Sequence, residues 1–113
     1  MFIRFDTYEI EQSLSTNCFE VDDLIAPAIS SLNRKGYKTA FSCSGHPDTG
    51  HDPEIAYIAF TFGGITPEYL PAGWNWVFDG QMEYRYHTAT ASTIKLVMSR
   101  LTAWAETLPD VSS

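Results

Sequence analysis

Positive charge is scarce in this chain. Its 113 residues include seven Lys and Arg against fourteen Asp and Glu, which gives a net charge of −7 at pH 7. Proteins that hold a nucleic-acid backbone normally present a basic patch, because the phosphates attract cations. Here only Arg34, Lys35 and Lys38 cluster along the sequence. We therefore expect no long nucleic acid as a partner.

Cysteines and long apolar runs are also scarce. The chain has two cysteines, Cys18 and Cys43, and they form no Cys-x-x-Cys pair, so nothing in their spacing requires a disulfide. No segment approaches the roughly 18 consecutive apolar residues of a membrane span. The first six residues contain no long apolar stretch of the kind that a signal peptide needs. We expect a cytoplasmic protein without a membrane partner.

What is present is the composition of a folded protein, with 44% hydrophobic and 14% aromatic residues. A chain of this length can bury a core of its own. We expect one α+β domain over 1–113. Residues 1–20 are an N-terminal extension in which a short strand can form, and residues 109–113 are a frayed tail.

Two segments have the spacing of amphipathic helices. Apolar residues recur every three to four positions from Leu24 to Leu32 and again from Ile94 to Leu108. Asp22 or Asp23 is the expected N-cap of the first helix, and Gly36 its expected end. The second helix is expected to begin near Ser92 and to stop before Pro109.

Strand patterns cover 37–43, 55–62, 74–78 and 82–87, and Asp79-Gly80 joins the last two as a hairpin signal. One helical turn is expected within 66–71. Strands with one apolar face need a helical layer to bury it. The sequence therefore predicts a two-layer α+β sandwich, with a mostly antiparallel sheet of about four to five strands and two helices on one face.

The most informative segment for function is Ser42-Cys43-Ser44-Gly45-His46, which directly follows a predicted strand. Small side chains and one glycine let consecutive backbone N–H groups turn toward a common point, which suits an anionic or polar ligand. The two serines add hydroxyl donors, and the histidine adds a ring nitrogen. The segment predicts a binding site for a small polar or phosphorylated molecule, although the same residues also suit a plain turn.

The same segment has the residue types of a nucleophilic enzyme. Cys43 and His46 are a potential thiolate and base, and Asp48 is available to orient the histidine. A small buried cysteine beside a turn-capping histidine is the simpler interpretation. We therefore expect no catalytic residue, and a small Cys/His or metal-dependent enzyme remains an alternative.

Histidine and aspartate gather in and just after this segment, at His46, Asp48, His51 and Asp52. These are suitable ligands for a divalent metal. Their spacing matches no strong zinc signature, and solvated turns often have this composition. We expect neither a metal nor a cofactor.

Aromatic residues alternate along both arms of the predicted hairpin, with Trp74 and Trp76 on one arm and Tyr84 and Tyr86 on the other. Such a face can belong to the core, stack a base or form a subunit interface. Arg85 lies between the two tyrosines and is a candidate phosphate partner. The stripe and an open sheet edge predict a homo-oligomer, most simply a dimer. The predicted ligand-binding residues are Ser42, Cys43, Ser44, Gly45, His46, Trp74, Trp76 and Arg85.

The run Leu32-Asn33-Arg34-Lys35-Gly36-Tyr37-Lys38-Thr39, followed by Ser42-Cys43-Ser44-Gly45-His46, resembles a family of small bacterial and bacteriophage proteins. These proteins share an LN(K/R)KGYKT segment and an SCSGH loop. The resemblance extends over about residues 20–108 and includes the closing helix with Trp104. The resemblance implies that this chain shares the fold of these proteins and that the loop is functional, but it indicates no reaction.

A second resemblance, over about fifteen residues, is to the methyltransferase family of tRNA wybutosine synthesis. That family carries a Ser-Cys-Ser-Gly-Arg loop after a similar helix and strand, and residues 42–45 match it, whereas His46 replaces the arginine. This chain is also shorter and lacks the basic surface that tRNA requires.

These observations favour a non-enzymatic protein that holds a small polar or phosphorylated molecule at the 42–46 segment. A bacteriophage counter-defence protein that sequesters a nucleotide-derived signal is one form of this hypothesis. The alternatives are a protein–protein interaction module that uses the aromatic hairpin, and a small enzyme, including one related to the wybutosine methyltransferases.

Overall fold

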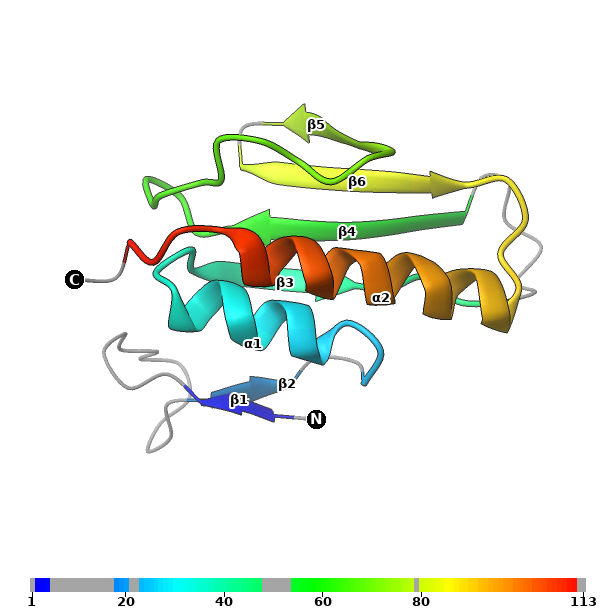
Figure 1. The fold of residues 1–113 in the computed structure, drawn as a ribbon, viewed down its shortest axis with the longest axis horizontal. Helices are drawn as coiled ribbons and strands as arrows, with labels where there is room; N and C mark the ends of the chain where they lie inside the picture. The colour runs from blue at the N-terminus through cyan, green and yellow to red at the C-terminus, as the bar shows by residue number, and fades with distance from the viewer. Residues whose placement is uncertain (1, 5–17, 21–22, 48–53, 79, 112–113) are drawn as a thin grey trace.

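Two helices lie across one face of an antiparallel sheet in the computed structural model of the protein (Figure 1). The structure describes residues 2–4, 18–20, 23–47, 54–78 and 80–111. The helices are α1 (Ala26–Arg34) and α2 (Ala91–Thr107). The strands of the sheet are β3 (Thr39–Cys43), β4 (Glu54–Phe60), β5 (Trp74–Phe78) and β6 (Gln81–Tyr86).

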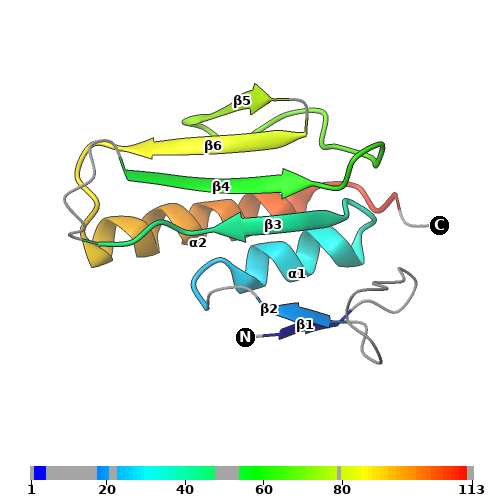
Figure 2. The ribbon, with the colours of Figure 1, turned by 180° about the vertical axis from the view of Figure 1, so that it is seen from behind.

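The strands are hydrogen-bonded in the order β3-β4-β6-β5, and every neighbouring pair is antiparallel. Figure 2 shows the opposite face of the sheet, over which neither helix lies. A separate antiparallel pair, β1 (Phe2–Arg4) and β2 (Cys18–Glu20), lies beside α1. The expected two-layer α+β architecture is therefore confirmed, with both helices on one face. None of the described helices has the length and apolarity needed to cross a membrane.

The alternation of side chains along β4 decides which face is buried. Ala56 and Ile58 are fully buried beneath the helices, whereas their neighbours Ile55 and Tyr57 point to the other face and are only half-buried. The register places Ile58 opposite Met82 of β6, which is also fully buried. The helices contribute fully buried apolar side chains to the same core, among them Ile25, Ala26, Ala28, Ile29, Leu32, Ile94, Leu101 and Ala105. Burying one large aliphatic side chain stabilises a fold by about 1.5–3 kcal/mol, so this face holds the layers together.

The start of α1 differs from the sequence-based expectation, whereas α2 begins at Ala91, near Ser92 as expected. The N-cap of α1 is Ile25, without a side-chain cap, because a turn over 23–25 separates Asp23 from the first helical residue; Asp22 lies outside the described residues. The N-cap of α2 is Thr90. Thr90 has an extended backbone, and its hydroxyl accepts the N–H of Thr93 at 3.2 Å, whereas Ser92 is already inside the helix.

The strand boundaries also differ from the expected ones, because backbone hydrogen bonds decide where a strand begins and ends. The N–H of Tyr37 donates to the carbonyl of Leu32 at 2.9 Å, and that of Gly36 donates to Asn33 at 3.1 Å. These two bonds, with Gly36 at φ +102°, form a Schellman C-cap, so the strand expected from 37 begins only at Thr39. β4 ends at Phe60 because Thr61 and Gly64 form a turn. Residues 66–71, where one helical turn was expected, form no helix.

Two side chains fix the junction between α1 and β3. The buried Asn33 amide donates to the carbonyl of Ile29 at 2.8 Å and to the Thr39 hydroxyl at 2.9 Å, and its oxygen accepts the Thr39 N–H at 3.0 Å. The Lys35 ammonium reaches the carboxyl end of α2. There it donates to the carbonyls of Ala105, Glu106 and Leu108 at 3.1, 2.7 and 2.8 Å.

The chain after α2 is held at the same junction. The Val111 N–H donates to the carbonyl of Lys35 at 2.7 Å, and the phenol of Tyr37 donates to the carbonyl of Pro109 at 3.0 Å. Burial raises the pKa of the Tyr37 phenol, and the negative charges of Glu68 and Asp110 add to this effect. The phenol therefore remains a hydrogen-bond donor up to an alkaline pH.

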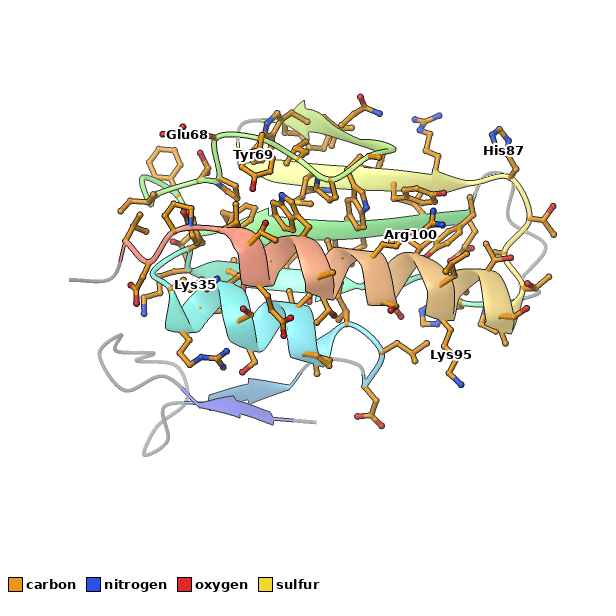
Figure 3. The ribbon with its side chains drawn as sticks, in the orientation of Figure 1. Lys35, Glu68, Tyr69, His87, Lys95 and Arg100 are labelled. Carbon is orange, nitrogen blue, oxygen red and sulfur yellow. The ribbon has the colours of Figure 1, made fainter. Side chains whose placement is uncertain are left out.

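We predict that Lys35→Met lowers the free energy of unfolding by about 2 kcal/mol, because three carbonyls at a helix C-terminus lose a charged donor. Urea denaturation followed by circular dichroism measures the change. Lys95→Met makes the same chemical change on the exposed side of α2 (Figure 3) and is expected to alter stability by less than about 0.5 kcal/mol. Equal effects of the two substitutions would contradict a capping role for Lys35.

Candidate functional site

The Ser42–His46 loop leaves the end of β3 at the same end of the sheet as the start of β4 and the end of β6. The pairing of Ser42 with Ile58 and of Cys43 with Tyr57 places Ser42 on the helix-covered face and Cys43 on the open face. Ser44 and Gly45 are buried, whereas His46 is exposed. The predicted loop thus exists, and its small residues form the buried part of it.

Two backbone donors of this loop, the N–H groups of Gly45 and His46, are bonded within the protein. The His46 N–H donates to the Glu54 carboxylate at 2.9 Å, and the Gly45 N–H donates to Sγ of Cys43 at 3.4 Å. Glu54 is only 7% exposed. The Glu54 carboxylate therefore occupies the position at which we expected an external anion to meet the His46 N–H.

Gly45 is required by both its conformation and its surroundings. Its φ of +93° is in the left-handed region that favours glycine, and a Cβ at this position would lie 2.9 Å from Cε2 of Tyr86. Tyr86 is only 2% exposed, and its hydroxyl donates to the Ser44 carbonyl at 2.8 Å. The ring cannot move away without breaking that bond, so the glycine lets β6 and the loop approach closely.

We predict that Gly45→Ala lowers the free energy of unfolding by about 2–4 kcal/mol, from backbone strain and the collision with Tyr86. Gly63→Ala is the matched control. Its φ is +76°, and no atom lies within 4 Å of the added carbon, so it experiences only the backbone strain of about 1–2 kcal/mol. Chemical denaturation of both variants measures the difference. If Gly63→Ala is as damaging as Gly45→Ala, the contact with Tyr86 is not a constraint.

The other predicted ligand-binding residues are not all near the loop. Arg85 is paired with Ile55 on the open face, near the loop end, and its Nε lies 3.2 Å from the Glu83 carboxylate. Trp74 and Trp76 lie on β5, which is separated from β3 by β4 and β6. The fold therefore does not gather all eight predicted residues at one site.

Four residues are candidate metal ligands, and they lie in and after the Ser42–His46 loop. Asp48, His51 and Asp52 lie outside the described residues, whereas His46 lies within them. Among the residues that the structure does describe, no group of three or more His, Cys, Asp and Glu side chains is placed to hold a metal ion.

A pocket of about 260 Å³ lies between the β5–β6 hairpin and α2. We call it the aromatic pocket, and it is lined by Pro71, Ala72, Trp74, Tyr84, Val97, Arg100 and Trp104. The rings of Trp74 and Tyr84 are in contact, with centroids 5.7 Å apart. Figure 3 shows the side chain of Arg100 extending from α2 toward β6. Arg100 is the single charged residue among those that line the pocket.

Hydrogen bonds fix the wall of the aromatic pocket that precedes β5. The indole N–H of Trp104 donates to the carbonyl of Tyr69 at 3.2 Å, and the Tyr69 hydroxyl lies 3.1 Å from the hydroxyl of Thr107. Gly73, at φ +90°, lets the chain pass close to the Tyr84 ring, because a Cβ there would lie 2.7 Å from Cε2 of that ring. The backbone over 69–73 is thereby bonded to α2 at Tyr69 and lies against β6 at Gly73.

Sequence reasoning identified one residue of the aromatic pocket, Trp74, as a ligand-binding candidate. Arg100 and Trp104 lie four residues apart, on one side of α2, and the sequence pattern showed only that Trp104 faces the core. The signal in the sequence that pointed to these two pocket residues is an arginine one turn before a tryptophan on an amphipathic helix. The sheet residues that line the pocket with them, Trp74 and Tyr84, could be identified only from the strand order.

No family model matches the chain, and neither the curated proteins nor the solved structures that were compared contain a match. The resemblances to the SCSGH-containing proteins and to the wybutosine methyltransferases therefore remain predictions.

Proposed function

We propose that this protein binds a small anionic molecule with a planar ring in the aromatic pocket, without converting it. The observation that carries the proposal is the position of one guanidinium, that of Arg100, at a pocket otherwise lined by aromatic and small apolar residues. Ligand sites commonly combine apolar walls with a few polar groups that fix orientation. A volume of about 260 Å³ suits one ring system with one acidic substituent.

The guanidinium of Arg100 is available to a ligand. Within the described part of the chain it makes no hydrogen bond or ion pair, and no acidic side chain lines the pocket. Arginine can bind carboxylate or phosphate through two parallel hydrogen bonds. By contrast, Nε of Arg85 is already paired with Glu83. Arg100 is therefore the stronger candidate for contact with an anion.

The walls select for a flat ligand. Trp74 and Trp104 are each 6% exposed, and Tyr84 is half-buried, so their rings are fixed by packing before a ligand arrives. Stacking on an aromatic side chain contributes about 1–3 kcal/mol for a nucleic-acid base. A rigid site also loses little side-chain entropy on binding.

The side chains that line the pocket can bind a ligand, but they include no group suited to catalysing a reaction. Its polar side-chain groups are the Tyr84 phenol, the Arg100 guanidinium and the indole N–H groups. None of these is a general base near neutral pH. A nucleotide-derived signal that the protein sequesters, as a counter-defence protein would, is one ligand of the proposed chemistry.

We predict that Arg100→Met weakens binding of the best ligand by about tenfold to a hundredfold, because a charged hydrogen bond contributes roughly 1.5–3 kcal/mol. Tryptophan fluorescence and calorimetry with mononucleotides, cyclic dinucleotides, ADP-ribose derivatives and aromatic carboxylates provide the ligand and its Kd. Arg85→Met is the matched control and is expected to bind as the wild type does.

The double variant Ser44→Ala/His46→Ala distinguishes the pocket from the loop. The proposal predicts unchanged binding in this variant. Loss of binding there, with Arg100→Met unaffected, would assign the ligand to the Ser42–His46 loop. If no compound in the panel raises Tm further as its concentration increases, the proposal that the protein binds a small ligand of this class is wrong.

A second proposal concerns self-association, and the observation that favours it is the exposed edge of β5. This strand ends the described sheet, and Trp76, Val77 and Phe78 are 41%, 37% and 69% exposed. Its five residues carry no charge, although the chain as a whole has a net charge of −7. A second copy that pairs its own β5 across a two-fold axis would therefore meet a neutral, apolar strand.

We predict a dimer at high micromolar concentration, measured by light scattering coupled to size exclusion. Val77→Glu is expected to raise the dissociation constant at least tenfold, since two like charges would face each other near the two-fold axis. Leu96→Glu changes another exposed aliphatic residue, on α2, and is expected to leave association unchanged. A wild-type monomer throughout this range, or equal weakening by both variants, would refute pairing through β5.

A further inference from the structure

A cysteine and a histidine lie together at the end of β3, on the face of the sheet that no described helix covers. Sγ of Cys43 lies 3.7 Å from Nε2 of His46, and the Gly45 N–H donates to the same sulfur at 3.4 Å. Cys43 is paired with Tyr57 across the ladder, so its side chain points away from the core. It is half-buried, and His46 is exposed. A small reagent can therefore approach the sulfur from the open face.

Both contacts favour the thiolate over the thiol. The imidazole can accept the thiol proton, and the resulting imidazolium then stabilises the negative sulfur beside it. The Gly45 N–H donates to the sulfur in either state and more strongly to the anion. The thiolate is the nucleophilic form of cysteine, so this environment promotes reaction with electrophilic sulfur.

The imidazole is held in place by the loop that carries it. The His46 N–H is bonded to the buried Glu54 carboxylate, and the preceding Gly45 has the left-handed backbone that turns His46 back toward Cys43. The hydrogen bond from Tyr86 to the Ser44 carbonyl fixes the start of this turn. The pair therefore stands on a rigid backbone and not on a freely moving chain.

The charges of the described residues around the pair are balanced locally. Glu54 beneath the loop accepts the His46 N–H. Across the ladder, Tyr57 is the neighbour of Cys43, and Glu83 is the next residue beyond it. The Glu83 carboxylate is 3.2 Å from Nε of Arg85. Each described carboxylate near the pair thus has a donor of its own, which reduces its repulsion of a thiolate.

We propose that Cys43 is a thiol–disulfide exchange site that takes a low-molecular-weight disulfide as its co-reactant. The Cys43 thiolate attacks one sulfur of that disulfide, the S–S bond breaks, and a mixed disulfide forms at Cys43. The other half leaves as a thiolate and takes up the proton that Cys43 released. One disulfide is consumed and one is formed, so no further oxidant is needed. This site is separate from the aromatic pocket and does not depend on the function proposed for it.

The test uses the full chain with oxidised glutathione as the probe. Mass spectrometry of tryptic peptides measures the rate of modification at Cys43 and at Cys18 in the same sample. An ordinary thiol with a pKa near 8.5 is about 1% ionised at pH 6.5, so it reacts there at roughly a hundredth of its rate at pH 9. We expect Cys43 to retain at least about a tenth of its pH 9 rate at pH 6.5.

His46→Gln is expected to lower the rate at pH 6.5 about tenfold and to restore the pH dependence of an ordinary thiol. His87→Gln removes another exposed histidine, at the end of β6 (Figure 3), and is expected to leave the rate within about twofold of the wild type. Circular dichroism confirms that each variant is folded. An ordinary pH profile in the wild type, or equal rates in the wild type and His46→Gln, would overturn the proposal.

Discussion

The buried apolar face holds the layers together, and the ion–dipole contact between Lys35 and the end of α2 fixes how the two helices are placed against each other. The last carbonyls of a helix have no partner within the helix, and here one ammonium receives three of them. The lysine belongs to the C-cap of α1, so the contact joins the two helices at the same end. Since Asn33 ties that end to β3 at Thr39, the helices and the sheet are fixed to one another at a single junction.

This junction explains the run from Leu32 to Thr39 without assigning it a ligand. Leu32 and Asn33 supply the carbonyls of the Schellman cap, Gly36 supplies its left-handed residue, and Tyr37 reaches the chain after α2. The three positive charges that cluster in the sequence therefore do not act together. Lys35 caps α2, whereas Arg34 is exposed and bonded to Ser30.

The fold could be predicted because its local signals agree with its packing. The alternation in β4, the hairpin signal before β6 and the apolar stripe of α2 each indicated the element that formed. The errors fell at element ends, where a backbone hydrogen bond decides the boundary, as at Tyr37 and Thr61. No periodicity in the sequence encodes such bonds.

The candidate site was less predictable, because strand order is a non-local property. The sequence placed Trp74 and the Ser42–His46 loop in one hypothetical site, yet two strands separate β5 from β3. The same order brings Trp74 and Tyr84 into one pocket with Arg100, for which the sequence indicated no function. Likewise, the choice of Glu54 as the acceptor of the loop N–H depends on the register between β3 and β4, which the sequence alone does not specify.

The buried Glu54 carboxylate explains why we propose an anion at Arg100 and not at the Ser42–His46 loop. A buried charge is tolerated only when hydrogen bonds compensate for its lost hydration, and the His46 N–H is one such bond. An external anion at this N–H would have to displace Glu54 or lie beside its negative charge. Arg100 presents no such obstacle, because no carboxylate lines its pocket, and charges more than about 10 Å away are largely screened at physiological salt. An acidic protein can therefore hold an anion at Arg100, while the Ser42–His46 loop uses its donors to position His46 against Cys43.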